Sequence, residues 1–257
     1  MTDRPTRLRF KPGNHAYELL VDPERNRWER LPSVTTLLSQ LDKPALTKWA
    51  SRTAAEYAVD NWEQLSALSP AERRTQIAGA PRQSRDKAAA KGTAIHAMAE
   101  DLIAGRTVNV PDELASKVQG LARWIEASRI KVIRTEAMVW TEPDPEFGSC
   151  GYAGTFDAIV EHPRHGITLI DWKTGTGVYP EFGVQVAGYA LAEWMSADGI
   201  DVPMPHVDCL AVAHVRPDGT DLHVLDPEQR QAAEDRFGLL RSLRLAEPPS
   251  FTLEAVA

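Results

Sequence analysis

The stretch "GITLIDWKTGTG", residues 166–177, interrupts an apolar segment with a carboxylate and an ammonium group two positions apart. The apolar run predicts a buried strand, and Asp171 and Lys173 lie near its end. Burial of a charged side chain costs several kcal/mol unless another group compensates it. The two residues therefore form a structural ion pair, or they belong to a chemical site.

A second acid lies in the preceding apolar segment, "GTFDAIV", residues 154–160. Because side chains alternate between the two faces of a strand, Asp171 and Lys173 share one face and start about 6.6 Å apart, at roughly 3.3 Å per residue. If residues 161–166 join the two segments as a hairpin, Asp157 becomes a cross-strand neighbour of Asp171.

Two neighbouring carboxylates need a cation. At a separation of about 4 Å they repel each other by roughly 4 kcal/mol at an effective dielectric constant near 20. Lys173 supplies one positive charge, and a divalent metal ion would supply two. Hard oxygen ligands favour Mg²⁺ or Mn²⁺.

Length and composition are those of an ordinary globular protein, with 257 residues, 43% hydrophobic and 25% charged. No window approaches the roughly 18 consecutive apolar residues of a membrane span. The N-terminal residues lack the apolar core of a secretory signal. We therefore expect a cytoplasmic protein without a membrane partner.

Two cysteines, Cys150 and Cys209, cannot form a disulfide framework or a four-thiolate site, so we expect reduced core thiols.

The net charge of −7 argues against a protein covered with non-specific nucleic-acid contacts, but it allows a local basic groove. Two stretches have four basic residues against one acidic residue: "RQSRDKAAAK" (82–91) and "RWIEASRIKVIR" (123–134). Taken alone, either stretch is better explained as a solvated helix face.

The order of predicted elements indicates an α/β fold with a mixed central β-sheet flanked by helices and an N-terminal helical region. We divide the chain into residues 1–130, an N-terminal hairpin and helical region, and residues 131–257, the α/β core, within one compact unit. After a hairpin at residues 15–31, the predicted helices are 32–41, 43–65, 69–79, 83–104, one beginning at Pro111, 180–197 and 227–245; the predicted strands are 131–140, 151–160, 166–173, 207–215 and 221–226.

The residues "GTFDAIV…ITLIDWKTG" resemble the core of the PD-(D/E)XK nuclease superfamily, in which an acid on one strand precedes acid-x-Lys on the next. "KGTAIHAMAE" (91–100) is similar to the Gly-x-x-x-His motif of the RecB-type branch, with Gly92 and His96. "QVAGY" (185–189) resembles its Gln-x-x-x-Tyr motif. "SVTTLL" and "DKPALTKWA" resemble the N-terminal region of phage and CRISPR-associated RecB-like exonucleases. The likeness spans roughly residues 33–190 and preserves the order of the motifs.

The resemblance implies a restriction-endonuclease-like core and a set of metal ligands. Asp157 and Asp171 would bind Mg²⁺ or Mn²⁺, together with the backbone carbonyl of Trp172. His96 would be a further ligand, which makes use of Mn²⁺ plausible. Glu100, one helical turn after His96, would orient the imidazole or meet the metal through water.

The catalytic roles follow the same resemblance. Lys173 would orient or deprotonate the attacking water and stabilise the transition state. Gln185 and Tyr189 are four residues apart on one helix face, and they would hold the substrate backbone or Lys173. Many relatives carry four cysteines that hold an iron–sulfur cluster. This chain has two, so it resembles the phage type and we expect no cluster.

The implied function is a metal-dependent DNA exonuclease of a bacterial or phage-infected host cell. It would act on single-stranded or end-containing duplex DNA in recombination, end resection or phage DNA processing, with a recombination or helicase partner. The alternatives are a non-catalytic module that binds DNA ends or a partner, a structure- or sequence-specific endonuclease, and a hydrolase of a smaller phosphate ester.

Each site residue also has a simpler interpretation. His96 could be a satisfied histidine on an amphipathic helix. Gln185 and Tyr189 could only pack the helix, and Glu100 could belong to a solvated face. We interpret Glu136, in "RTEAMVW", as a surface strand acid.

Overall fold

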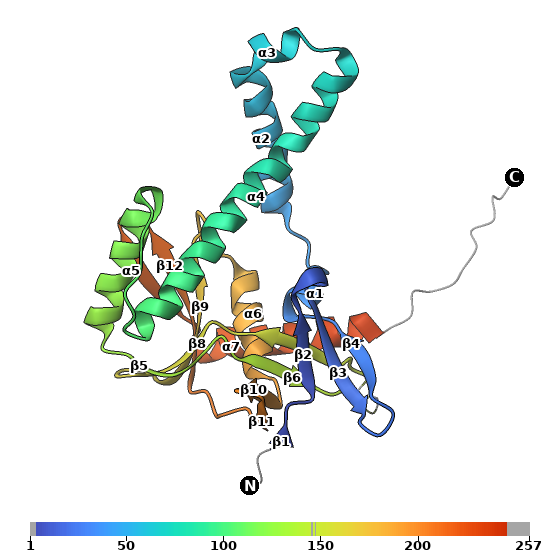
Figure 1. Cartoon of the computed structure of the whole chain (residues 1–257), viewed down its shortest axis with the longest axis vertical. Coiled ribbons are helices and arrows are strands. Elements are labelled where there is room, and N and C mark those ends of the chain that lie inside the picture. Colours follow the sequence, from blue (N-terminus) through green and yellow to red (C-terminus); the bar gives the residue numbers. More distant parts are fainter. Residues whose placement is uncertain (1–3, 145, 147, 246–257) are drawn as a thin grey trace, which may run out of the picture.

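The computed structural model describes residues 4–144, 146 and 148–245 as a mixed α/β fold (Figure 1). Its central sheet has the strand order β13-β12-β9-β8-β5. These strands are β5 (Lys131–Thr135), β8 (Ala158–His162), β9 (Gly166–Lys173), β12 (Cys209–Arg216) and β13 (Gly219–Val224). β9 and β12 are parallel, and the other neighbours are antiparallel, so the predicted mixed sheet is confirmed.

Helices cover both faces of this sheet. On one face, α1 (Val34–Leu38), α6 (Pro180–Ala190) and α7 (Pro227–Leu245) share a core with Leu169. On the other face, α4 (Pro70–Ile103) and α5 (Ala115–Ser128) share a core with Ile170 and Trp172. The alternation along β9 therefore places Asp171 on the side of α6, because its neighbours Ile170 and Trp172 face α4 and α5.

A second sheet is antiparallel, with the order β1-β11-β10-β6-β7. It contains β1 (Arg4–Pro5), β6 (Met138–Thr141), β7 (Tyr152–Thr155), β10 (Trp194–Ala197) and β11 (Ile200–Pro203). The prediction of one helix over residues 180–197 was wrong, because α6 ends at Ala190 and β10 follows it. Asp198 and Gly199 have φ values of 54° and 79° and form the turn between β10 and β11.

The N-terminal hairpin is confirmed and has one additional strand. β2 (Leu8–Lys11), β3 (Ala16–Asp22) and β4 (Arg27–Leu31) form a three-stranded antiparallel sheet, with the short 3₁₀ turn η1 (Pro12–Asn14) between β2 and β3. Buried residues from this sheet pack against Trp140 and Ala153 of the second sheet. Ser33 caps α1 as expected, because its hydroxyl accepts the Thr36 N–H at 2.9 Å.

Two segments that the sequence presents as single strands are divided between the sheets. Residues 131–140 form β5 in the central sheet and β6 in the second sheet, and residues 151–160 form β7 and β8 in the opposite order. Glu136 has a φ of 47°, which interrupts the extended backbone, and its N–H donates to the Asp157 carbonyl at 3.1 Å. The junction between the two sheets therefore lies at Glu136 and Asp157.

An arm of helices projects from the sheets (Figure 1). It consists of α2 (Pro44–Asp60), α3 (Trp62–Ser66) and the N-terminal half of α4. α4 begins at a Ser69–Glu72 capping box and continues through Pro81, so the separate helices predicted at 69–79 and 83–104 are one element. Leu65 and Ala80 are the buried residues of the arm, whose segment from 44 to 91 is otherwise at least partly exposed.

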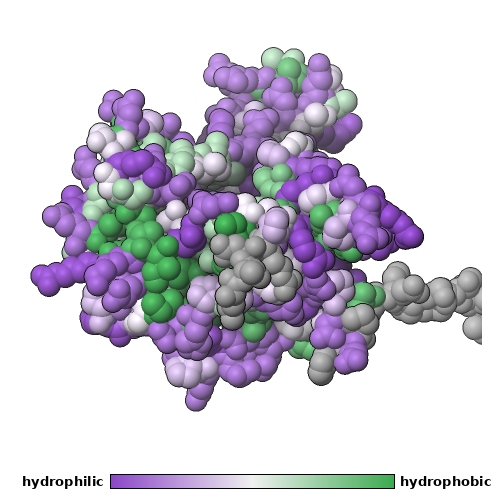
Figure 2. Space-filling model, turned by 60° about the horizontal axis from the view of Figure 1, so that its bottom comes forward, coloured by the Kyte–Doolittle hydropathy of each residue, from purple (hydrophilic) through white to green (hydrophobic). Residues whose placement is uncertain are grey.

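The remaining elements follow the predictions. The short 3₁₀ turn η2 (Asp112–Leu114) leads from Pro111 into α5. β5 is an edge strand that exposes Val132 and Ile133, and Figure 2 shows apolar side chains gathered on this side of the molecule. Of the helices within the described residues, none combines the length and apolarity that crossing a membrane requires.

Candidate active site

The two acids singled out in the sequence lie on neighbouring strands. β8 and β9 pair antiparallel with Ala158 opposite Ile170, and the same register continued by one residue places Asp157 opposite Asp171. Asp157 directly precedes β8, and its Oδ2 accepts the backbone N–H of Trp172 at 2.7 Å. The predicted cross-strand relationship is therefore present, and Asp157 is anchored to the strand that carries Asp171.

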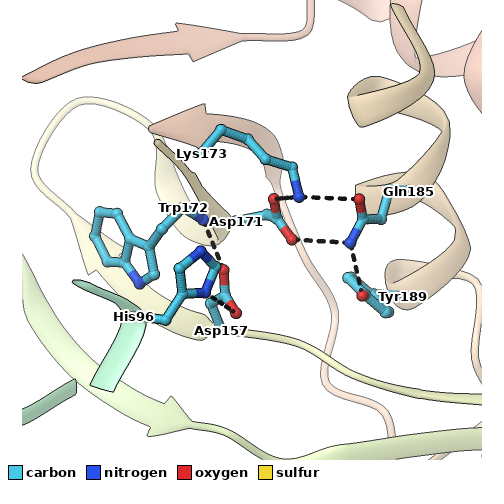
Figure 3. A network of polar contacts seen from close by, with 7 residues as sticks. All are labelled: His96, Asp157, Asp171, Trp172, Lys173, Gln185 and Tyr189. Atoms are coloured by element: carbon cyan, nitrogen blue, oxygen red, sulfur yellow. Dashed lines mark hydrogen bonds and ion pairs between the residues drawn. The ribbon is translucent and has the colours of Figure 1, made fainter. Parts of the chain in front are cut away.

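Lys173 is held over Asp171 by a glutamine from α6 (Figure 3). Its Nζ lies 2.5 Å from Asp171 Oδ2 and donates to Gln185 Oε1 at 3.0 Å. Gln185 Nε2 donates to Asp171 Oδ1 at 3.2 Å and to the Tyr189 hydroxyl at 2.9 Å. Because residues 185 and 189 are one turn apart on the helix, Gln185 bridges the strand end to a buried tyrosine.

His96 reaches the site from α4. Its Nδ1 lies 3.2 Å from Asp157 Oδ1. Burial alone would lower the pKa of His96, but the hydrogen bond and negative charge of Asp157, aided by Asp171, raise it overall. Gly92, one turn earlier, allows the helix to come this close, because a Cβ there would lie 3.3 Å from Thr174 Oγ1.

Beside His96 there is an open pocket of about 500 Å³, lined by Ala89, Gly92, Thr93, His96, Ala97, Glu100, Glu136 and Asp157. Glu100 faces this pocket and lies 3.4 Å from Arg106. Glu136 is a surface acid, as interpreted from the sequence, but it lies at a bend between β5 and β6 and not within a strand. Its left-handed backbone turns it toward the pocket beside Asp157. Partial desolvation, followed by the charges of Asp157 and Glu100, raises the pKa of Glu136 to about 7.

Burial and mutual repulsion disfavour the ionised form of the acidic groups in the site. Asp171 is 2% exposed, and burial together with the charge of Asp157 raises its pKa to about 6, although Lys173 acts in the opposite direction. Burial and the nearby Asp171 charge also raise the pKa of Tyr189. A further cation would relieve this repulsion.

The donor atoms fit a hard divalent cation in part. Asp171 Oδ2 is buried and lacks a hydrogen-bond partner within the described residues, apart from its close ion pair with Lys173. His96 Nδ1 and Asp157 Oδ1 lie 3.2 Å apart, a hydrogen-bond separation that two ligands of one ion can also have. Among the described residues, however, no three His, Cys, Asp or Glu side chains converge on one point, because Asp171 is turned toward Lys173 and Gln185.

The structure thus brings together the side chains of Asp157, Asp171, Lys173, Gln185, Tyr189 and His96, with Glu100 at the edge of the pocket. The Trp172 side chain points to the opposite face, where its ring packs edge-on against that of Trp124, with the ring centroids 5.8 Å apart. Its backbone N–H serves Asp157, and metal binding by its carbonyl stays a prediction.

Sequence reasoning missed the residues that fix the loop after Lys173. Lys117 Nζ donates to the Thr174 carbonyl at 2.7 Å, and His214 Nε2 lies 2.8 Å from the Gly175 carbonyl. Phe182, three residues before Gln185 on α6, has its ring 4.9 Å from Lys173 Nζ. The helical spacing could have indicated Phe182, whereas nothing local in the sequence marks Lys117.

Comparison with known proteins adds little. No model of a known protein family matches the chain, and no curated protein matches it significantly. Among solved structures, the chain is similar to one described as "Crystal structure of SSO0001", at 15% identity and a TM-score of 0.32, with 85% of this chain and 86% of that chain covered.

Proposed function

We propose that the protein is a metal-dependent deoxyribonuclease that hydrolyses phosphodiester bonds from DNA ends. One observation carries the proposal. Two acids on neighbouring strands, Asp157 and Asp171, lie beside a lysine whose ammonium group is held in place by Gln185. A buried carboxylate, Asp171, opposite a partly buried one, Asp157, is costly to fold, so the pair favours a role in chemistry over a role in stability.

Asp157, Asp171 and His96 are the residues that would hold Mg²⁺ or Mn²⁺, with the Trp172 carbonyl and Glu100 as further donors. Oxygen ligands with one imidazole suit these ions. When bound, such an ion would lower the pKa of a water ligand and stabilise the charge on the phosphate. The burial of Asp171 beside Asp157, where only the Lys173 ammonium group contacts Asp171 Oδ2 within the described residues, supports this assignment.

Lys173 is the residue placed to act on the phosphate. Its side chain is 18% exposed, so a substrate can contact it while Asp171 and Gln185 fix its position. A positive charge held in a partly buried site stabilises negative charge that develops on a phosphoryl oxygen, and it can orient the attacking water. Gln185 and Tyr189 act by positioning Lys173 and Asp171.

The preference for ends, and the setting in recombination, end resection or phage DNA processing inside a bacterial or phage-infected cell, rest on the resemblance of the motifs. The same applies to a recombination or helicase partner. A binding module that keeps the fold without catalysis is the second candidate. It has no need of an acid buried next to a second carboxylate, and the burial of Asp171 beside Asp157 and Lys173 favours the enzyme.

The test uses end-labelled linear DNA and closed circular DNA, each with Mg²⁺ or Mn²⁺. The wild type should degrade linear DNA only, and Lys173→Ala should be slower by about 100-fold or more. Lys131→Ala is the matched control, because Lys131 is an exposed lysine on an edge strand of the same sheet. Equal cutting of circles would favour an endonuclease, and DNA binding without cleavage would favour the binding module.

A further inference from the structure

The second half of the arm presents a basic surface that the candidate site does not use. Every residue from Arg82 to Lys91 on α4 is exposed. Residues 43–91 contain nine Lys or Arg and five Asp or Glu, a formal charge of +4, whereas the rest of the chain has 20 against 31, a charge of −11. Positive charge is therefore concentrated on the arm of an acidic protein.

Two arginines of this surface lie on the face of α4 that carries His96. Ala89 and His96 both line the open pocket, which defines this face. At 3.6 residues per turn, Arg85 precedes Ala89 by about one turn and Arg82 precedes it by about two turns. Lys87, nine residues before His96, is about two and a half turns away and lies on the opposite face.

The two arginines lie at increasing distances from His96 along α4. Arg85 and Arg82 are 11 and 14 residues before His96, which corresponds to about 16 Å and about 21 Å at a rise of about 1.5 Å per residue. The side chains between them and His96 on this face are small, namely Ala89 and Gly92. The pocket wall therefore continues as an unobstructed helix surface toward the two arginines.

The arginines are available for a partner. Their contacts are ion pairs with Asp86, at 3.7 Å for Arg82 and 3.2 Å for Arg85, and both arginine side chains are more than 60% exposed. Exposed pairs of this kind contribute little, so exchange for another anion costs little. On the side of the arm that Figure 2 shows, hydrophilic side chains predominate. The large exposed apolar residues of the arm, Leu46, Val59 and Trp62, lie on α2 and α3, outside the surface at residues 82–91.

We propose that Arg82 and Arg85 bind phosphates of the DNA strand whose scissile phosphate lies at Asp157, Asp171 and Lys173. The inference rests on the proposed function and extends it, because it assigns the path of the strand along α4. At the rise of about 3.4 Å per nucleotide that a strand has in B-form DNA, Arg85 lies about five nucleotides from the site and Arg82 about six. A more extended single strand would span the same distance with fewer nucleotides.

Binding is measured with a fluorescent 20-nucleotide single strand, by anisotropy, in the Lys173→Ala background without divalent ions. Each single-strand phosphate contact contributes about 0.7 to the slope of log affinity against log salt. Arg82→Gln with Arg85→Gln should therefore reduce this slope by about 1.4 and weaken binding about tenfold or more at low salt. Lys87→Gln, on the opposite face of α4, is the control for Arg85→Gln. It should leave the salt slope and the affinity nearly unchanged.

Cleavage by the otherwise wild-type enzyme separates this inference from the proposed function. The arginine variants should raise KM for a 20-nucleotide strand without lowering kcat, and they should hydrolyse bis-p-nitrophenyl phosphate at the wild-type rate. Active enzyme with unchanged KM and an unchanged salt slope would overturn the arginine assignment and leave the nuclease standing. Arginine-dependent binding without any cleavage would support the assignment and contradict the nuclease.

Discussion

Asp157 Oδ1 lies 3.2 Å from His96 Nδ1, although 61 positions separate the two residues in the chain. The other oxygen of the same carboxylate accepts the Trp172 N–H at 2.7 Å. Asp157 thereby connects helix α4 to the central strand β9. The candidate active site depends on this connection, because it places the imidazole beside the two acids.

If His96 is a metal ligand, its removal must weaken metal binding. We expect His96→Ala to raise the dissociation constant for Mn²⁺ by about tenfold or more, since even partners of metal ligands contribute about 10- to 100-fold to affinity. Free Mn²⁺ is measured by electron paramagnetic resonance during a titration. His206→Ala is the control, because its side chain is 85% exposed in the loop before β12. An unchanged titration for His96→Ala would remove this residue from the site.

Gln185 hydrogen-bonds to Lys173, Asp171 and Tyr189. Tyr189 is therefore connected to Lys173 and Asp171 through Gln185. Gln185→Leu removes the donor to Asp171 Oδ1, although Lys173 still contacts Oδ2, and should lower the free energy of unfolding by about 1–3 kcal/mol. It should also reduce cleavage more than Tyr189→Phe, which retains the contacts to Asp171 and Lys173. Urea denaturation and the linear-DNA assay test both variants. Equal cleavage by the two variants would contradict the positioning role of Gln185.

Glu136 predicts a pH dependence of stability in the metal-free protein. Its pKa is raised from 4.5 to about 7 on folding, so the folded state favours the protonated acid. The destabilisation is absent below the unfolded pKa, grows as the pH rises, and is complete above the folded pKa. Glu136→Gln should therefore be more stable than the wild type above about pH 7 and equally stable below about pH 4.

Urea midpoints of both proteins across this pH range, with a chelator present, test the prediction. In an Asp157→Asn background the gain from Glu136→Gln should be smaller, because the charge of Asp157 contributes to the raised pKa. A stability difference that does not vary with pH would show that Glu136 does not titrate in this way.

Gly154 controls the position of Tyr189. A Cβ at Gly154 would lie 2.7 Å from Tyr189 Cε1 and 3.1 Å from Val34 Cγ2, so the tyrosine would have to move. Gly154→Ala should lower the free energy of unfolding by about 1–3 kcal/mol and impair cleavage through Gln185. Gly238→Ala on α7, where no atom lies within 4 Å, should instead raise it by about 0.5–1 kcal/mol. An unaffected Gly154→Ala would contradict this coupling.

The part of the site that the sequence predicts best lies on β8 and β9. Two apolar runs with a short turn between them predict a hairpin, and the hairpin register then places Asp157 opposite Asp171. The four-residue spacing of Gln185 and Tyr189 likewise predicts a shared helix face. These relationships are local, so residue spacing is sufficient to predict them.

The bend at Glu136 could not be predicted in this way. Strand-forming residues continue from 131 to 140, and one residue with a positive φ transfers the chain to another sheet. Tertiary packing rather than local preference decides this transfer, and it brings Glu136 into the pocket. The turn at Asp198 and Gly199 did carry a hairpin signal, which the helix-like composition of residues 180–197 obscured.

A divalent ion held between the two neighbouring acids is the central claim, and a crystal soaked in Mn²⁺ tests it most directly. We expect an anomalous-scattering peak in contact with carboxylate oxygens of both Asp157 and Asp171, and loss of that peak in Asp171→Asn. A well-ordered site without a peak, or a peak that neither carboxylate contacts, would contradict the account.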